Sequence, residues 1–518
     1  MKVILNPATA ASFQTTPRST AGGQTRARER RLNRKENFLP GNAASPALNQ
    51  IPLCVDLDGT LVKSDTLFDS LCVLVRQKPL SVLSIPGWLA GGKANLKAKV
   101  AAAAPLDATR LPVNQAVLQF LQSQHDLGRP IYLVTGADHS LAARVADHLG
   151  LFSGVIASDG ATNLVSNHKL AGLQLKFPAF DYIGNSTADL PVLAHSGQVL
   201  VANPSRALLA GLQARHLPIA QRFEDRKPAL PTLLKAVRIH QWAKNILIFL
   251  PILLAHDLSL PHLWAAIQAF ICFSLFASAN YLINDLLDLQ SDRHHPRKRL
   301  RPFAAGDLPV AAGLALVLLL VATTCSILPW LSPGFAFWLL VYAVSTSLYS
   351  LYLKRIALVD VLMLSGLYTL RILAGAAATQ TVISPWLASF AVFLFLSLAM
   401  VKRFSELENL RERGVPSTHG RGYSTTDIEQ IRSFGTSSAH AAVVVFCFYI
   451  SRPDVDSLYR HSTRLWLIVP FMLYWLYRIW LLASRGELDE DPVIFAIRDP
   501  VSLVVAACIA VLAVFAAR

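Results

Sequence analysis

A series of apolar segments in the C-terminal part of the chain constrains its fold more than any other feature. A membrane-crossing helix needs about 20 mostly apolar residues, and we predict about nine such spans. They lie at 244–256, 262–284, 310–328, 334–353, 357–379, 385–402, 434–451, 464–482 and 500–517. Backbone polar groups in lipid must be satisfied within the protein, so these segments should be helices packed into a bundle. The sequence therefore predicts an all-α polytopic membrane domain over residues 224–518, here called the helical half.

The composition and the charges support a membrane location. With 53% hydrophobic and 16% charged residues, the chain is too apolar for a soluble enzyme of this size. Its net charge of +15 suits basic loops facing anionic headgroups, so we expect no nucleic-acid partner. The loops near 257, 330 and 381 carry no Lys or Arg, whereas the 285–309 loop is rich in both. The loop at 452–464, which is also basic, opposes this trend. We predict a bacterial inner membrane protein with its basic side in the cytoplasm.

Residues 51–223, here called the sheet half, follow a different pattern. Short apolar runs such as "IPLCVDLDGT", "PIYLVTGAD" and "FDYIGNS" end in polar or glycine-containing turns, with helical stretches between them. This indicates a Rossmann-like α/β domain with a parallel sheet, whose ligands bind at the carboxyl ends of the strands. Residues 1–50 are predicted to be a disordered basic tail, with a transit peptide as the alternative. The six scattered cysteines indicate neither a zinc site nor a disulfide framework.

The stretch "NYLINDLLDLQSDRHHPRKRLRP" at residues 280–302 carries the main acidic motif of the helical half. If one helix continues through residue 292, Asp285, Asp288 and Asp292 share a face, with Asn284 beside them. Carboxylates gathered at a membrane boundary need a cation, and oxygen ligands without cysteine favour Mg²⁺. Magnesium would bind a substrate diphosphate and make it a good leaving group. The alternative is that these acids only pair with the neighbouring basic residues in a solvated loop.

The run "NDLLDLQSD" resembles the NDxxDxxxD signature of the UbiA superfamily of intramembrane prenyltransferases, and the resemblance covers residues 230–518. Within it, "HPRKRLRP", "YSLYLKRIALVDVLML", "LRILAGA" and "RGELDEDPVIFAIRDP" resemble the decaprenyl-phosphate phosphoribosyltransferase branch. The resemblance implies that the three aspartates hold Mg²⁺ on a diphosphate. It also implies that a further set of polar residues contacts substrate: Lys298, Arg301, Tyr349, Lys354 and Asp360.

Two more features of the helical half bear on an anionic substrate. Arg371 lies within a predicted span, where an unpaired guanidinium is costly without a phosphate or carboxylate, so it is a candidate anion site. The run "RIHQWAKN", with Arg238, Trp242 and Lys244, resembles the helix at which lipid enters in that superfamily and implies contact with a lipid phosphate. Trp242 and Tyr349 are alternatively only interfacial aromatic residues.

The resemblance implies a transferase that joins polyprenyl phosphate to the phosphoribosyl group of 5-phosphoribosyl 1-diphosphate. The wider superfamily has a second acidic DxxxD motif, whereas this chain has only Asp360 there, which favours the phosphoribosyl branch. One alternative is transfer of an isoprenoid from a prenyl diphosphate to an aromatic or other small acceptor. A non-catalytic membrane scaffold that senses lipid or phosphate is another.

In the sheet half, "VDLDGTL" places Asp56 and Asp58 directly after a predicted strand. Two residues apart, both carboxylates can face the same mouth of the sheet, and Gly59 permits a sharp exit of the chain. One carboxylate can attack phosphorus to form an aspartyl-phosphate while the other handles the proton. A turn-forming aspartate pair with no catalytic role is the alternative.

The sheet half resembles the haloacid dehalogenase superfamily over its full length. Thr135 in "YLVTGAD", Lys169 in "NHKLAGLQ" and Asp189 in "GNSTAD" follow in that superfamily's order and spacing. The resemblance implies that Asp56 is the nucleophile and Asp58 the acid/base. It further implies that Thr135 and Lys169 contact phosphate, and that Asp189 binds Mg²⁺ together with the first two aspartates.

One position departs from that pattern. Asn185 stands where the superfamily most often has an acid, and it offers magnesium a carbonyl oxygen without charge. The insert between Asp65 and Gln124 is expected to be a small helical cap. We predict that this domain is a phosphatase that removes the ribose 5-phosphate, with a vestigial regulatory domain as the alternative.

Overall fold

The computed structural model describes residues 51–414, 421–488 and 491–517. The predicted disordered tail at residues 1–50 lies outside the described residues.

The sheet half contains a six-stranded sheet in the order β3-β2-β1-β4-β5-β6, and every strand pair is parallel. The strands are β1 Leu53–Val55, β2 Ile131–Asp138, β3 Gly154–Ser158, β4 Asp181–Gly184, β5 Val199–Ala202 and β6 Ile219–Phe223. In register, Val55 of β1 lies beside Leu133 of β2 and Ile183 of β4. The chain turns in opposite directions on the two sides of β1, so the ends of β2, β1 and β4 form a crevice where ligands bind in such sheets. The predicted α/β fold is confirmed.

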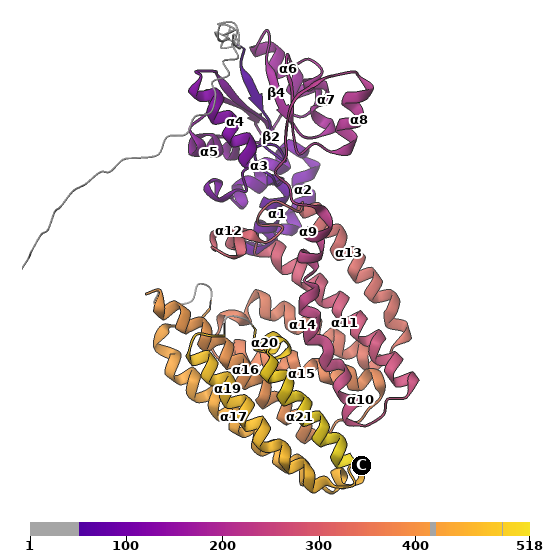
Figure 1. Cartoon of the computed structure of the whole chain (residues 1–518). Helices are drawn as coiled ribbons and strands as arrows, with labels where there is room; N and C mark the ends of the chain where they lie inside the picture. Colours follow the sequence, from indigo (N-terminus) through magenta and orange to yellow (C-terminus); the bar gives the residue numbers. More distant parts are fainter. Residues whose placement is uncertain (1–50, 415–420, 489–490, 518) are drawn as a thin grey trace, which may run out of the picture. The chain divides into compact units, whose positions relative to one another are not determined.

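Helices α4 Gln115–Asp126 and α5 His139–Leu149 cover one face of this sheet, and α6 Asn167–Lys176, α7 Leu190–Leu193 and α8 Arg206–Ala214 cover the other (Figure 1). The insert after β1 contains α1 Thr66–Gln77, α2 Ile85–Ala90 and α3 Lys93–Ala103. Alternate residues of β1 enter different cores: Leu53 and Val55 pack with α1, α4 and α5, whereas Cys54 packs with α6, α7 and α8. Burial on both faces explains why the strands read as continuous apolar runs. The insert between Asp65 and Gln124 is helical, as predicted.

The helical half contains eight helices that are long and apolar enough to cross a membrane, counted over the described residues. They begin with α11 Leu260–Leu287, α13 Val310–Ile327, α14 Pro333–Leu351 and α15 Val359–Thr379. They continue with α16 Pro385–Glu412, α17 Ile428–Ile450, α19 Ile468–Ser484 and α21 Pro500–Ala517. Shorter α-helices are α9 Ala229–Val237, α10 Leu250–Leu254, α12 Leu289–His294, α18 Pro453–Leu458 and α20 Pro492–Arg498. The predicted bundle of apolar helices is confirmed.

The predicted span at 244–256 is not among the eight long apolar helices of the described chain. This segment forms the 3₁₀ helix η5 Ile239–Phe249 followed by α10. Where about nine spans were predicted, the described chain therefore has eight long helices and one shorter helical segment. The reason is that η5 carries buried polar side chains, Lys244 and Asn245, which bind other residues of the bundle instead of facing lipid. The segment also packs very closely on α15, because a Cβ at Gly375 would lie 2.2 Å from the carbonyl oxygen of Ile248.

The predicted single helix through residue 292 is also interrupted. Helix α11 ends at Leu287, Asp288 is its C-terminal cap, and α12 begins at Leu289. Backbone bonds nevertheless continue the helical repeat across the break, because Asp288 N donates to Asn284 O and Asp292 N donates to Asp288 O. Other 3₁₀ helices are η2 Pro79–Ser84, η3 Ala108–Arg110, η4 Thr187–Asp189, η6 Lys298–Leu300, η7 Leu328–Trp330, η8 Leu353–Arg355, η9 Thr425–Asp427 and η10 Ser462–Leu467.

Candidate functional sites

The polar residues predicted in the sheet half gather at the carboxyl ends of its central strands. Asp56 follows β1, Thr135 lies in β2, and Asn185 follows β4, which pairs with β1. The loop after β1 turns at Gly59, whose φ is +76°, and a Cβ there would lie 2.0 Å from Nδ2 of Asn185. Glycine is therefore required for the loop to bring Asp58 back toward the cavity.

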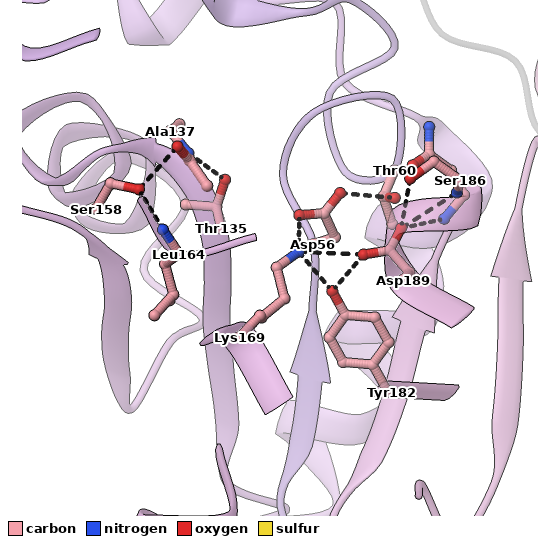
Figure 2. Close-up of polar contacts among 12 residues, drawn as sticks. Asp56, Thr60, Thr135, Ala137, Ser158, Leu164, Lys169, Tyr182, Ser186 and Asp189 are labelled. Atoms are coloured by element: carbon pink, nitrogen blue, oxygen red, sulfur yellow. Dashed lines mark hydrogen bonds and ion pairs between the residues drawn. The ribbon is translucent and has the colours of Figure 1, made fainter. Parts of the chain in front are cut away.

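Lys169 of α6 is the centre of this group (Figure 2). Its Nζ lies 2.8 Å from Oδ1 of Asp56, 3.1 Å from Oδ1 of Asp189 and 2.8 Å from the hydroxyl of Tyr182. The Tyr182 hydroxyl in turn donates to Asp189 at 3.0 Å. All four side chains are buried, so the ammonium group neutralises two carboxylates that would otherwise repel each other in a poorly solvated place. A phosphate bound here would meet both a cation and a nucleophile.

The other predicted residues of the sheet half have distinct partners. Asp58 accepts a hydrogen bond from the backbone N–H of Thr66 at 2.8 Å, and Thr60 donates to Asp56 at 3.4 Å. The Thr135 hydroxyl accepts from the backbone N–H of Ala137, and it makes no hydrogen bond to Asp56 or Lys169 within the described chain. Oδ2 of Asp189 accepts from the backbone N–H groups of residues 185 and 186 and from a serine hydroxyl.

Burial changes the acidity of these groups. It raises the pKa of Asp56 to about 6, opposed by the nearby Lys169 charge. It raises the pKa of Asp58 to about 7, and the like charges of Asp65 and Asp56 add to the effect. Burial also opposes ionisation of Asp189, but Lys169 and two backbone N–H groups outweigh it and lower the pKa of that carboxyl. Asp58 can thus hold a proton near neutral pH, which suits a general acid, while Asp189 stays ionised.

A cavity of about 340 Å³ lies over this group. Its lining includes four oxygen-bearing residues, Asp56, Asp58, Asn185 and Asp189. Such donors suit Mg²⁺ in kind. Sequence reasoning missed several other residues at this site: Tyr182 in the core of the group, and the cations Lys63, Lys97 and Arg226 in the cavity lining. Tyr182 lies in the predicted strand "FDYIGNS", where an apolar pattern gives no reason to separate this tyrosine from ordinary core residues.

The predicted departure at Asn185 leads to a test. Replacing Asn185 by aspartate adds a charge beside the other carboxylates, so the Mg²⁺ concentration that gives half-maximal phosphatase activity should fall roughly tenfold. A magnesium titration with p-nitrophenyl phosphate measures this. Asn167→Asp, the same change at an exposed position of α6, is the control. An unchanged or higher half-saturation for Asn185→Asp would place residue 185 outside the metal site.

In the helical half, Arg301 brings two of the predicted aspartates together. Its Nη1 lies 3.0 Å from Oδ1 of Asp285 and 2.7 Å from Oδ2 of Asp292. Arg238 also donates to Oδ1 of Asp285. Both carboxylates are buried, and the shared guanidinium shows that they face the same side despite the break between α11 and α12.

Asp288 has different partners. Lys354 donates to its Oδ2 at 3.1 Å, and Arg76 of the sheet half lies 3.6 Å from its Oδ1. The three aspartates are therefore paired with four basic residues. Among the described residues, no three His, Cys, Asp or Glu side chains are close enough together to hold one metal ion. The pairing with basic residues, which the sequence left open, is thus present. Asp285 and Asp292 are buried, whereas Asp288 and the four basic partners are partly exposed.

A second, partly buried group surrounds Asp491, the N-cap of α20. Lys244 of η5 and Lys402 of α16 each donate to its Oδ2 at 2.8 Å, and the Tyr368 hydroxyl donates to Oδ1 at 2.8 Å. Lys244 was predicted, but Asp491, Lys402 and Tyr368 were not. Asp491 lies in the quoted run "RGELDEDPVIFAIRDP", which is the signal that could have identified it. Two ammonium groups that share one carboxylate carry an excess of positive charge.

The remaining predicted residues are distributed as follows. Asp360 is fully buried and accepts from Nε of Arg403 at 2.6 Å and from the Tyr423 hydroxyl at 2.5 Å, while the Tyr349 hydroxyl accepts from the same arginine at 3.4 Å. No described contact joins Asp360 to the Asp285 group. The side chains of Asn284 and Lys298 make no hydrogen bond or ion pair within the described chain.

Arg371 is buried in the bundle, as expected for a residue inside a span. It donates to Asn245 Oδ1 at 2.8 Å and to the backbone oxygen of Leu367, and its guanidinium lies 5.2 Å from the ring centre of Tyr342. It forms no ion pair with an acid among the described residues. Its charge is therefore stabilised by dipoles and aromatic faces, and it stays a candidate for binding an anion.

Comparisons with known proteins identify relatives of both halves. Residues 245–516 match the UbiA prenyltransferase family. The uncharacterized protein y4nM of Sinorhizobium fredii is 38% identical over 470 residues, which cover 89% of this chain and 90% of that protein. The decaprenyl-phosphate phosphoribosyltransferase of Mycobacterium tuberculosis is 31% identical over 275 residues, covering 52% of this chain and 88% of its own. Because the first match leaves about a tenth of this chain uncovered, it includes most of the sheet half.

A solved structure of a UbiA homolog from Archaeoglobus fulgidus, bound to GPP and Mg²⁺, is 16% identical. It covers 55% of this chain and 99% of its own, with a TM-score of 0.42. A solved structure of a HAD family hydrolase from Salmonella enterica is 14% identical and covers 34% of this chain and 67% of its own, with a TM-score of 0.25.

Proposed function

Because the chain belongs to the UbiA prenyltransferase family, we propose that it is a membrane transferase that uses 5-phosphoribosyl 1-diphosphate as donor and polyprenyl phosphate as acceptor. The sheet half then removes the 5-phosphate from the ribosylated lipid. The observation that carries the proposal is the group formed by Asp285, Asp292 and Arg301. In this group two carboxylates that could bind a metal ion lie next to a guanidinium that could bind phosphate. The likeness to a decaprenyl-phosphate phosphoribosyltransferase supports this choice of donor.

Asp285, Asp288 and Asp292 would hold Mg²⁺ in the helical half. The three carboxylates do not form a ready metal cluster among the described residues, so the fit rests on donor chemistry alone. All three offer carboxylate oxygens, and Asp285 and Asp292 already share a cation, Arg301. Bound there, the ion would neutralise charge that develops on a departing diphosphate. Arg301, Arg238 and Lys354 can exchange their carboxylate partners for phosphate oxygens, because each is a flexible cation in a charge-assisted contact.

The phosphate group of the acceptor lipid needs a second, positively charged binding site. We assign it to Lys244 and Lys402, whose ammonium groups share Asp491. With the acceptor phosphate held there, one of its oxygens forms a bond to C1 of the ribose. The bond from C1 to the diphosphate oxygen breaks, and the electron pair leaves with the diphosphate. The lipid phosphate becomes a phosphodiester that still carries a phosphoribosyl group.

The sheet half would complete the sequence of reactions. Asp56 attacks the phosphorus of the 5-phosphate, and Asp58 gives its proton to the leaving ribose oxygen. Water then attacks the aspartyl-phosphate, Asp58 takes a proton from that water, and inorganic phosphate leaves. Lys169 holds Asp56 in place and neutralises the phosphate. We place these residues, like the basic loops of the helical half, on the cytoplasmic side of a bacterial inner membrane.

A donor assay tests the proposed transferase. Purified protein with Mg²⁺ and polyprenyl phosphate should release diphosphate from 5-phosphoribosyl 1-diphosphate and form a ribosylated lipid, and excess EDTA should stop the release. The same assay with geranyl diphosphate and small aromatic acceptors tests the alternative activity, prenyl transfer. The name of the matched family, UbiA prenyltransferase, favours this alternative. Diphosphate release only from the prenyl donor would overturn the proposed donor. No release from either would indicate a non-catalytic role.

A further inference from the structure

Helix α1 of the sheet half runs from one candidate site to the other. At its start, the backbone N–H of Thr66 donates to Asp58, the proposed acid/base of the phosphatase, at 2.8 Å. In its last turn, the Arg76 side chain reaches Asp288 of the helical half. The helix has 12 residues, which at 1.5 Å per residue gives a rod of roughly 18 Å.

Two sets of ion pairs hold this helix on the helical half. Asp69 in its first turn accepts from Arg293, which directly follows Asp292, at 2.7 Å, and both side chains are almost completely buried. Ser64 donates to the same aspartate at 2.6 Å. Next to the helix, Lys63 lies 2.8 Å from Asp307 of the helical half. Breaking a buried pair leaves an uncompensated charge, so these contacts fix the start of α1 on the helical half. Because the helix is a rigid rod, they also set where its last turn lies.

At that end, Arg76 lies between two elements of the transferase site. Its Nη1 donates to the backbone oxygen of Ser350 at the end of α14, and its Nε lies 3.6 Å from Oδ1 of Asp288 at the end of α11. Lys354 holds the other oxygen of the same carboxylate. Nη2 of Arg76 makes no hydrogen bond with another described residue, and the side chain is 17% exposed. A mostly buried guanidinium with a free donor group, beside a proposed metal ligand and a lysine, can bind an additional anion.

We propose that Arg76 is a substrate-binding residue of the transferase, supplied by the sheet half, and that it binds the diphosphate of the donor together with Lys354. This rests on the proposed transferase activity. Arginine suits the role because its planar fork binds two phosphate oxygens at once. The fused domain then has two roles: it carries the phosphatase and it completes the donor site. Helix α1 provides a rigid connection between them.

The test compares Arg76→Ala and Arg76→Lys with the wild-type full chain. Arg76→Ala should raise the KM for the donor roughly 10- to 100-fold, because a charged hydrogen bond is lost. It should weaken donor binding, measured by calorimetry with Mg²⁺ and without acceptor, by a similar factor. Arg76→Lys should fall between the two. The KM for the acceptor and the hydrolysis of p-nitrophenyl phosphate should change less than about twofold. Arg144→Ala, which removes an exposed arginine of α5, is the matched control.

The outcomes separate the possibilities. Unchanged donor KM and donor binding in Arg76→Ala would overturn the proposal, as would a loss of kcat alone, which would make Arg76 only a contact between the halves. If the wild type uses a prenyl diphosphate instead, the proposed donor fails, but Arg76→Ala should still raise the KM for that diphosphate. If the wild type binds neither donor, both proposals fail.

Discussion

Replacing Asp56 by asparagine should leave the lipid product with a phosphate that the wild type removes. The change keeps the size of the side chain but replaces the attacking carboxylate by an amide, which is a far poorer nucleophile. We expect hydrolysis of p-nitrophenyl phosphate to fall roughly a thousandfold or more. Mass spectrometry of the lipid from the coupled reaction should show phosphoribosyl lipid in place of ribosyl lipid. Diphosphate release should continue, because the polar side-chain partners of Asp56 in the described chain, Thr60 and Lys169, both belong to the sheet half.

The control for this experiment is Asp126→Asn, which makes the same change at an exposed position of α4. It should behave like the wild type. If Asp56→Asn gives a product with unchanged phosphate content, the sheet half does not process the product, and a regulatory role for it is favoured. Loss of Lys169's partner could also loosen the domain, so thermal unfolding of both variants should be compared. A stable variant without hydrolysis is the expected result.

The sheet half was largely predictable because its chemistry follows local patterns. Apolar runs ending in polar turns predicted strands whose carboxyl ends carry the site. In the structure Lys169 forms ion pairs with both Asp56 and Asp189. Their catalytic roles stay predictions. Tyr182 could not be predicted, because a tyrosine in a buried strand is usually core, and only the fold shows that its hydroxyl lies between a lysine and an aspartate.

The helical half was less predictable, because its polar contacts join residues that are far apart in the sequence. Helical spacing predicted that Asp285, Asp288 and Asp292 share a face. Arg301 joins the first and the last of them, whereas Asp288 has other partners. Spacing could not show that Lys244 meets Asp491, which lies 247 residues further along the chain. The same contact lies in the segment 244–256, which is not among the eight long apolar helices of the described chain. A hydropathy pattern counts apolar residues, and it does not register that a buried lysine must have a partner inside the bundle.

Both candidate sites share one electrostatic design, in which basic side chains already occupy the places that a metal ion and phosphates would take. Lys169 lies between Asp56 and Asp189, and Arg301 lies between Asp285 and Asp292. Without such cations the neighbouring carboxylates would repel each other. The arrangement balances part of their charge before substrate binds. It also provides cations that can turn to phosphate oxygens once a metal ion takes their place.

Replacing Asp288 by asparagine tests this design where it should matter most for the transferase. The change removes one negative charge from the proposed metal site and leaves Lys354 without its ionic partner. We expect diphosphate release at saturating donor to fall roughly a hundredfold or more, because stabilisation of the leaving group is lost. The Mg²⁺ concentration for half-maximal rate should rise. Glu429→Gln, an acid-to-amide change at an exposed position of α17, should leave both quantities unchanged.

The phosphatase provides the internal reference for this variant. Asp288 contacts Arg76 of the sheet half, so a substitution that disturbed folding there would also affect the phosphatase. Hydrolysis of p-nitrophenyl phosphate would then fall together with diphosphate release. A loss confined to diphosphate release instead places the defect in the transferase site. If Asp288→Asn kept the wild-type rate and the wild-type magnesium dependence, the aspartates would serve only to anchor basic residues. The chemistry would then have to be assigned to the other, partly buried charge group, around Asp491, where two lysines and a tyrosine meet one carboxylate.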